Sequence, residues 1–248
     1  MKRRAYLFVA LAFAAIVGSP LAEEARIRSD PHEVTARYLT ILLNVGRLVV
    51  ERYQPLINDP EKGDKGFTPD LFEREVIAEF LRQTGVDLRH LPADVPALAQ
   101  ELLPVLLESS KQVVADAQLV INQRGIGYKN FIPATFGSQA SRKFSARSRV
   151  MLKQTTLNPR NPKNAPDAYE ERILRRLAAQ PASNNPVAEW VDEGKTLRMM
   201  TPIYYSADCL GCHGSPAGIL DISGYPREGA REGDLAGAIS VKIPVFLP

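Results

Sequence analysis

Residues 187–205 read Val-Ala-Glu-Trp-Val-Asp-Glu-Gly-Lys-Thr-Leu-Arg-Met-Met-Thr-Pro-Ile-Tyr-Tyr, and this stretch indicates the class of fold. Residues 187–191 are rich in strand-forming side chains, and a return strand is expected over residues 197–205. The polar residues 192–195 between them predict a hairpin turn that is longer than the tightest type. Because a hairpin joins antiparallel strands, the stretch predicts an antiparallel sheet.

Two segments on either side of this hairpin extend the expected sheet. Residues 151–156 favour a strand, and residues 238–246 alternate apolar and polar side chains as a last strand would. One short helix is expected between the strands, over residues 166–177, with Asn164 as its cap and acidic residues near its start.

The first half of the chain is expected to be helical. Apolar residues recur there at helical spacing, Pro31 and Pro69 stand where a helix can begin, and Gly85 stands where the second helix can end. The expected helices span about residues 31–53, 69–85 and 98–122, with Pro104 as a candidate kink in the third. Helices followed by antiparallel strands predict an α+β fold. We expect a single domain over residues 30–248, whose helical part covers about residues 30–125.

The N-terminus, residues 1–22, has the order of a secretory signal peptide. Basic residues at positions 2–4 precede an apolar run over residues 5–17, and small residues follow. The run is short for a membrane span, but Pro20 is a poor neighbour for a cleavage site, so an uncleaved N-terminal anchor is the alternative. Either interpretation places residues 30–248 in the periplasm, with membrane contact only through an uncleaved N-terminus.

The charge of the chain excludes one class of partner. The formal net charge is +3, from 31 basic and 28 acidic residues, and three of the basic residues lie in the N-terminal segment. Without that segment, the 28 remaining basic residues equal the 28 acidic residues. A protein near neutrality has no general attraction to nucleic acid, so we expect no nucleic-acid partner.

The two cysteines of the chain lie in one segment, Cys209-Leu210-Gly211-Cys212-His213. This C-x-x-C-H spacing is the attachment signature of a c-type haem. Each thiol adds to one vinyl group of the porphyrin, and the adjacent histidine is held under the iron as its proximal ligand. The sequence therefore predicts one covalently bound haem, with Cys209 and Cys212 as thioether anchors and His213 as the iron ligand. Such attachment occurs outside the cytoplasm, which agrees with the export signal.

Three other interpretations of the cysteine pair are weaker. A thioredoxin-like redox pair would be expected within a β-α-β pattern, and none surrounds these residues. A zinc site would need further ligands, and the other histidines are His32 and His90. A disulfide across so short a spacing would be strained.

The sixth ligand of the iron would decide the function, and the sequence leaves several candidates. Met199 and Met200 are adjacent on the expected strand, so their side chains point to opposite faces and at most one can face the haem. Met151, His32 and His90 are further candidates, although both histidines occupy positions that favour exposure. An open or water-filled sixth position is the alternative. An open position admits diatomic gases, whereas a methionine or histidine ligand suits redox sensing or electron transfer.

Residues near the motif could seat the porphyrin, which needs apolar walls and cations near its propionates. The candidate walls are Leu210, Ile219, Leu220, Ile222, Tyr204 and Tyr205. The candidate cations are Lys153, Arg160, Lys163 and Arg198. Ordinary core packing and solvated surface charge are the competing interpretations of these residues.

With these residues in view, the second half of the chain resembles the c-type-haem, PAS-like periplasmic sensor domains of bacteria, long known as a domain of unknown function. The resemblance extends over most of residues 35–245. It rests on the segments 153–167 (Lys-Gln-Thr-Thr-Leu-Asn-Pro-Arg-Asn-Pro-Lys-Asn-Ala-Pro-Asp), 200–203 (Met-Thr-Pro-Ile), 209–214, 225–226 and 233–241 (Gly-Asp-Leu-Ala-Gly-Ala-Ile-Ser-Val).

The resemblance implies a PAS-like antiparallel sheet with N-terminal helices packed on it. It also implies the same roles for Cys209, Cys212 and His213, and a sensing function. Some relatives carry an extra cysteine suited to ligating the iron on its distal side. This sequence has none, so a thiolate ligand on that side is excluded.

Three function classes follow from these observations. The first is a stand-alone sensor or binding module for redox state or a small diatomic gas. The alternative is a monohaem electron-transfer cytochrome that serves a redox partner protein. An enzyme such as a haem peroxidase is least favoured, because it needs a distal acid/base group within reach of bound peroxide. The apolar stripe of the first helix could also join two copies into a homodimer.

Overall fold

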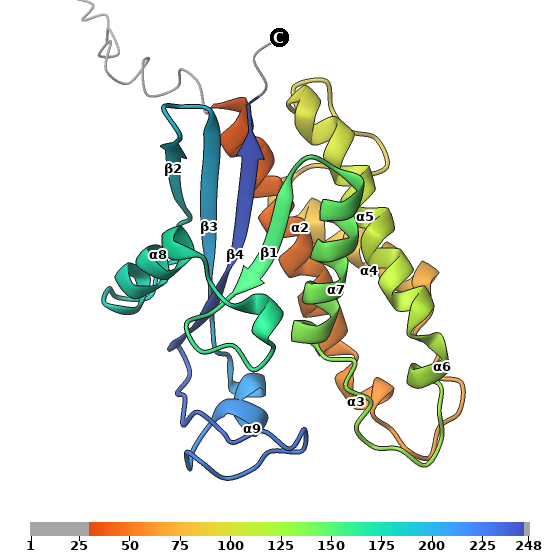
Figure 1. The fold of residues 1–248 in the computed structure, drawn as a ribbon. Helices are drawn as coiled ribbons and strands as arrows, with labels where there is room; N and C mark the ends of the chain where they lie inside the picture. The colour runs from red at the N-terminus through yellow and green to blue at the C-terminus, as the bar shows by residue number, and fades with distance from the viewer. Residues whose placement is uncertain (1–29, 246–248) are drawn as a thin grey trace, which may run out of the picture. The chain divides into compact units, whose positions relative to one another are not determined.

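A four-stranded antiparallel sheet with helices on both faces is formed by residues 30–245, the part of the chain that this computed structural model describes (Figure 1). From Pro31 onward the chain forms one compact unit. The segment 1–22, for which a signal peptide or anchor is expected, lies outside the described residues. Among the described helices, none has both the length and the apolar character needed to cross a membrane.

The order of elements confirms the expected α+β fold. The helices are α2 (Pro31–Arg52), α3 (Gln54–Ile57), α4 (Pro69–Thr84), α5 (Ala97–Asp116), α6 (Gln118–Ile121), α7 (Pro133–Arg147), α8 (Ala168–Ala178) and α9 (Leu210–His213). The strands are β1 (Met151–Thr155), β2 (Val187–Val191), β3 (Thr196–Tyr204) and β4 (Leu235–Pro244). Short 3-10 turns lie at Pro162–Asn164 and Ala207–Cys209.

The strands lie in the order β1-β4-β3-β2, so β4 occupies an inner position although it comes after the other three in sequence. The expected hairpin joins β2 to β3, where Val191 pairs with Thr196. Its turn has left-handed backbone at Asp192, Glu193 and Gly194, with φ of 54°, 57° and 82°. The prediction of a turn longer than the tightest type is confirmed.

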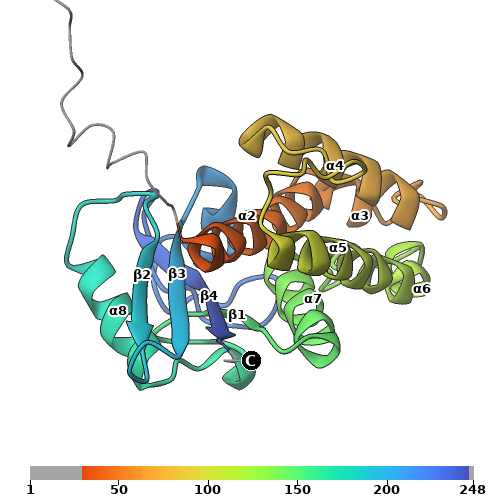
Figure 2. The ribbon, with the colours of Figure 1, turned by 90° about the horizontal axis from the view of Figure 1, so that it is seen from above.

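The two faces of the sheet pack against different helices (Figure 2). Helices α2 and α7 cover one face, and α8 covers the other. Met199 belongs to the large core on the α2 side, whereas Met200 packs in a smaller cluster with Ile173 and Leu174 of α8. The expected orientation of the two methionines to opposite faces is confirmed.

Helix α4 begins and ends at the expected residues. The side chain of Thr68 accepts a hydrogen bond from the backbone N–H of Leu71 at 3.1 Å, which caps the helix start. Gly85 ends the helix with a φ of 74°, a left-handed conformation that glycine adopts without steric cost.

The expected helices differ from the structure at three points. The third runs through Pro104 and is interrupted at Ala117, between α5 and α6. Helix α7 was not expected, and it extends the helical part to Arg147. Helix α8 is capped by Asp167 and not by Asn164, because Asp167 and Glu170 form a reciprocal capping box that satisfies two backbone N–H groups.

Candidate functional site

The C-x-x-C-H motif lies in the connection between β3 and β4, residues 205–234, where its last four residues form α9 (Figure 1). Two backbone hydrogen bonds close the neck of this connection. The N–H of Gly233 donates to the carbonyl of Tyr205, and the N–H of Tyr205 donates to the carbonyl of Asp234, each at 2.9 Å. The motif is therefore presented on a loop whose two ends are tied together where they leave the sheet.

The imidazole of His213 is held from one side by a carboxylate. Its Nδ1 lies 2.7 Å from Oε2 of Glu228. Burial raises the pKa of Glu228, but hydrogen bonds from Arg160 and His213 outweigh this and hold that pKa below its usual value. An ionised carboxylate accepts a hydrogen bond, so Nδ1 carries the proton and Nε2 is the ring nitrogen that is available to bind a metal. The ring of Tyr205 packs against the imidazole, with centroids 5.0 Å apart.

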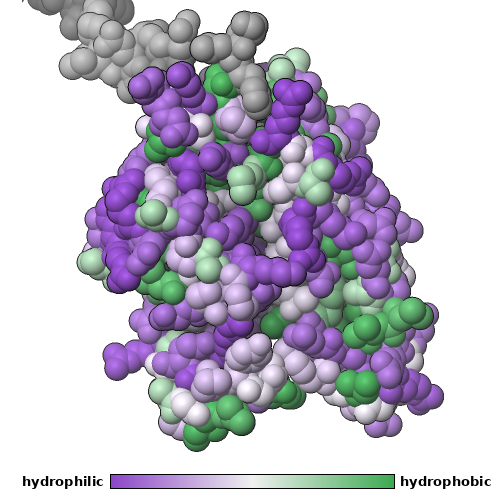
Figure 3. All heavy atoms as spheres, in the orientation of Figure 1, coloured by the Kyte–Doolittle hydropathy of each residue, from purple (hydrophilic) through white to green (hydrophobic). Residues whose placement is uncertain are grey.

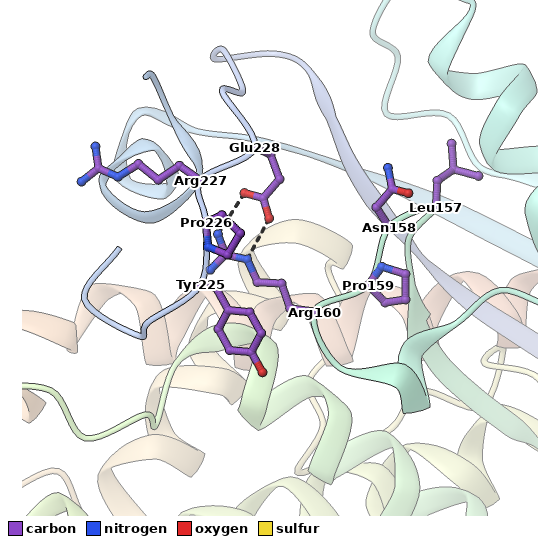
Figure 4. A pocket seen from close by; sticks show the side chains of 8 residues that line it. All are labelled: Leu157, Asn158, Pro159, Arg160, Tyr225, Pro226, Arg227 and Glu228. Carbon is purple, nitrogen blue, oxygen red and sulfur yellow. Dashed lines mark hydrogen bonds and ion pairs between the residues drawn. The ribbon is translucent and has the colours of Figure 1, made fainter. Parts of the chain in front are cut away.

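Arg160 connects this carboxylate to the rest of the loop (Figure 4). Its Nε and Nη2 donate to the two oxygens of Glu228 at 2.7 Å and 2.9 Å. Its Nη1 donates to Oδ2 of Asp221 at 2.6 Å, and Nη2 also donates to the carbonyl of Cys212 at 2.9 Å. The same guanidinium lies 5.5 Å from the ring centre of Tyr225. One side chain from the segment after β1 therefore fixes three points of the motif loop.

An open hollow of about 530 Å³ borders Arg160 (Figure 4). The residues that line it come from the two segments that Arg160 joins. They are Leu157, Asn158, Pro159, Arg160, Tyr225, Pro226, Arg227 and Glu228.

The two thiols are half-buried and unpaired. Sγ of Cys209 lies 3.3 Å from the hydroxyl of Ser206 and 3.9 Å from Oε1 of Glu51 on α2. Burial raises the pKa of the Cys212 thiol, and the nearby carboxylate of Asp221 raises it further. The first cysteine thus faces the helical layer, while the second faces the loop that Arg160 organises.

Apolar side chains after the motif are unusually exposed. The exposed fractions are 54% for Ile219, 64% for Leu220 and 68% for Ile222. Figure 3 shows apolar residues gathered at the lower end of the molecule, over the connection that holds α9. Clustered exposed apolar groups of this kind mark binding surfaces more often than isolated ones do. These three residues are among the walls expected from the sequence.

Of the four expected cations, Arg160 is the one that reaches the motif. Lys153 donates to Glu170 at 2.8 Å, and Arg198 donates to Asp167 at 2.8 Å, so both belong to the start of α8. Lys163 is exposed.

Among the candidate sixth ligands, Met199 and Met200 are buried in the core, whereas Met151 and His90 are exposed at the surface. Met199 and Met200 have an exposed fraction of 0% and pack in the two core clusters, while Met151 is 58% exposed. The side chain of His90 is 86% exposed, and His32 packs edge-on against Trp190 at 5.6 Å between ring centres. The sixth ligand therefore stays a prediction.

Three acidic residues at the site were not expected from the sequence, namely Glu51, Asp221 and Glu228. Glu51 lies far along the chain from Cys209, which it contacts. Asp221 and Glu228 lie on a loop whose sequence has no periodic pattern. A carboxylate close to the predicted iron ligand could be sought on chemical grounds, since metal-binding histidines usually donate their other N–H to such a group. The sequence alone offers several acidic residues for that role.

The residues around the motif fit a covalently held haem. Unpaired thiols at the required spacing, an imidazole with its Nε2 left for a metal, and exposed apolar side chains beside them are what such a group needs. The buried Nε of Arg227, in the same loop, has no hydrogen-bond partner within residues 30–245. A buried donor without a partner is consistent with a missing polar group such as a propionate.

Comparisons with known proteins found one family model and one solved structure that are similar to this chain. The model of the Tll0287-like family matches residues 96–244, more than half of the chain. A solved structure, described as that of the cyanobacterial heme-protein Tll0287, is 18% identical, with a TM-score of 0.43 over 62% of this chain and 98% of the other. No curated protein sequence matches the chain at a significant level. The matched range includes every segment on which the resemblance to haem sensor domains rests, and the chain belongs to the Tll0287-like family.

Proposed function

We propose that this chain is an exported protein that carries one covalent c-type haem and serves as a stand-alone sensor or binding module for redox state or a small gas. The observation that carries the proposal is the orientation of His213, whose Nδ1 is engaged by Glu228 and whose Nε2 is left for a metal. A haem bound at this motif supplies an iron that changes oxidation state and can take up a diatomic gas. The family takes its name from a cyanobacterial haem protein, which supports this cofactor.

Each residue of the motif has a separate task in this proposal. Cys209 and Cys212 anchor the porphyrin covalently, and His213 holds the iron. Glu228 and Tyr205 keep the imidazole from rotating. Because both neighbouring methionines are fully packed in the core, an open sixth position is favoured over a methionine ligand.

Export to the periplasm is part of the proposal. The order of basic, apolar and small residues in positions 1–22 supports it. The C-x-x-C-H motif supports it independently, since haem is attached to such motifs outside the cytoplasm. A purified periplasmic fraction should therefore contain the protein with its haem attached.

The test is a visible absorption spectrum of the purified periplasmic protein, recorded oxidised, reduced, and reduced with CO. We expect haem absorbance to survive acid–acetone extraction in the wild type and to be absent in the double variant Cys209→Ser/Cys212→Ser. Leu119→Ala, at an apolar residue that is 89% exposed, is the control and should keep the wild-type spectrum. Extraction of the haem from the wild-type protein would contradict covalent attachment.

The response to CO separates gas binding from redox sensing and from electron transfer. A large shift of the reduced spectrum means an open or labile sixth position and supports gas binding. An unchanged spectrum means a firm sixth ligand, and the protein would then be a redox sensor or an electron-transfer cytochrome. One observation favours the electron-transfer alternative, because the exposed apolar residues beside the motif offer a contact surface for a redox partner protein. Turnover of hydrogen peroxide by the pure protein would contradict a purely binding role.

A further inference from the structure

His213 and Glu228 are not an isolated pair, because Arg160 holds the same carboxylate. Oε2 of Glu228 accepts from Nδ1 of His213 at 2.7 Å and from Nη2 of Arg160 at 2.9 Å, while Oε1 accepts from Nε of Arg160 at 2.7 Å. The negative charge of one carboxylate is therefore shared between an imidazole and a guanidinium. All three groups are partly shielded, with exposed side-chain fractions of 29% for His213, 34% for Glu228 and 22% for Arg160.

The guanidinium cannot easily leave this position. Its Nη1 also donates to Asp221, and its Nη2 donates to the carbonyl of Cys212. The segment that carries Arg160 is itself fixed, because Oδ1 of Asn161 accepts from the N–H of Lys163 at 3.0 Å and starts a 3-10 turn. The contact between Arg160 and Glu228 is strong because its two parallel hydrogen bonds are charge-assisted, a geometry that lysine cannot reproduce.

We propose that Glu228 and Arg160 are positioning residues that set the reduction potential of the iron held by His213, in opposite directions. This inference rests on the proposed function. A carboxylate that accepts from Nδ1 makes the imidazole a stronger electron donor, which favours the ferric state and lowers the potential. The guanidinium draws part of that negative charge to itself, which weakens the effect and raises the potential.

This arrangement gives the segment Arg160-Asn161-Pro162 a role in addition to starting the 3-10 turn. The segment lies about fifty residues before the motif in the chain, yet its arginine reaches the carboxylate behind the iron ligand. Any movement of the segment relative to the motif loop would change how the charge of Glu228 is divided. The potential is therefore coupled to the local conformation.

The experiment is a spectroelectrochemical titration of the purified holoprotein and of three variants. Glu228→Gln is expected to raise the midpoint potential, and Arg160→Gln is expected to lower it. We expect each change to be about tenfold in the one-electron equilibrium, which corresponds to about 59 mV. In the double variant the effect of Arg160→Gln should shrink, because the carboxylate on which it acts is gone.

Two further measurements separate electrostatics from damage to the fold. Glu232→Gln, at an exposed acid of the same loop, should leave the potential unchanged. Arg160→Lys keeps the charge and should lie between the wild type and Arg160→Gln. Resonance Raman spectra of the reduced proteins should show a lower iron–histidine stretching frequency in Glu228→Gln, which a change in folding stability alone does not produce.

The outcomes distinguish this inference from the proposed function. Absence of covalent haem in the wild type, measured as the pyridine haemochrome, would contradict both the inference and the proposed function. Normal haem content with potentials that move in the same direction, or not at all, in Glu228→Gln and Arg160→Gln would overturn the inference and leave the haem assignment intact.

Discussion

Asp221 is the most deeply buried acid of the motif loop, with a side-chain exposed fraction of 0%. Burial by itself raises its pKa. Hydrogen bonds from the hydroxyl of Ser223, the guanidinium of Arg160 and the backbone N–H of Tyr225 outweigh this and hold the pKa well below its ordinary value. The ionised form is thus the one that the folded loop requires.

The sign of the resulting pH dependence follows directly. A carboxyl with a lowered pKa in the folded state contributes stability above its unfolded pKa of about 4, and this contribution is lost as the pH falls towards the folded pKa. We expect the protection factors of amides in the loop 205–234, which correct for the pH dependence of intrinsic exchange, to fall below about pH 4, while the core strands stay protected until lower pH.

The variant Asp221→Asn should remove much of that acid dependence. At pH 7 the variant is expected to be less stable by roughly 1–3 kcal/mol, because Arg160 keeps its charge without this partner. Thermal unfolding between pH 7 and pH 3 measures both effects, with Glu232→Gln, at an exposed acid of the same loop, as the control. A variant whose stability falls with acid as steeply as that of the wild type would contradict the role given to Asp221.

Single residues were predictable where the chemistry is local in sequence. The cysteines and His213 form a five-residue signature, so their roles could be proposed without a structure. Arg160 could be singled out as a cation, but its partners could not, because Glu228 lies 68 residues away. No local periodicity relates two side chains that meet only when separate loops pack together.

At the scale of elements, α8 shows which of several neighbouring candidate residues becomes the N-terminal cap of a helix. Asn164, Asp167 and the intervening Pro166 all favour the start of a helix. Asp167 caps α8 because Glu170 stands three residues later and its carboxylate accepts a hydrogen bond from the backbone N–H of Asp167 at 2.9 Å. Asn164 instead ends a 3-10 turn and accepts a hydrogen bond at its Oδ1 from Ser138 on α7, at 3.0 Å.

Replacing this cap should weaken the whole protein. Asp167→Ala is expected to lower the free energy of unfolding by about 1 kcal/mol for the lost cap, and by more if the contact with Arg198 adds to it. Urea unfolding followed by circular dichroism measures the loss. Asp94→Ala, at an exposed loop residue, is the control and should be neutral. Equal midpoints for the two variants would argue against the cap.

Helix α7 was missed because its local signals are weak. The segment contains Gly137 and several serines, which are poor helix formers. A signal was nevertheless present, since Phe136, Ala140 and Phe144 recur every four residues and all three are fully buried. Tertiary packing against α2 and β1, rather than intrinsic propensity, makes this segment a helix.

For the molecule as a whole, α2 is a central element, because it packs against β3 and β4 of the sheet and against α4, α5 and α7. Close packing at α2 depends on Gly46, since a Cβ at this position would come within 2.8 Å of two ring atoms of Phe136. Gly46→Ala is therefore expected to lower the free energy of unfolding by about 1–3 kcal/mol. Chemical denaturation gives the value. Gly127→Ala is the control, because a Cβ at this position would meet only one carbonyl oxygen, at 3.9 Å. An equally large loss of stability in Gly127→Ala would refute the packing argument.

The fold class was predictable because it depends on patterns within short windows, such as the hairpin at 192–195 and the alternation of Met199 and Met200. The strand order was not, because β4 could pair with either neighbour on local grounds. Its place between β1 and β3 comes from long-range packing of both sheet faces.

The inner position of β4 also has a consequence for the time order of maturation. Under the proposed export, the cysteine segment leaves the translocation channel before residues 235–244 do, because an exported chain emerges from its N-terminus. Until those residues arrive, β1 and β3 have no strand between them, and the neck of the connection lacks its Asp234 partner. We expect the two thiols of the proposed haem site to be open to covalent attachment during this interval, and insertion of β4 to close the sheet afterwards.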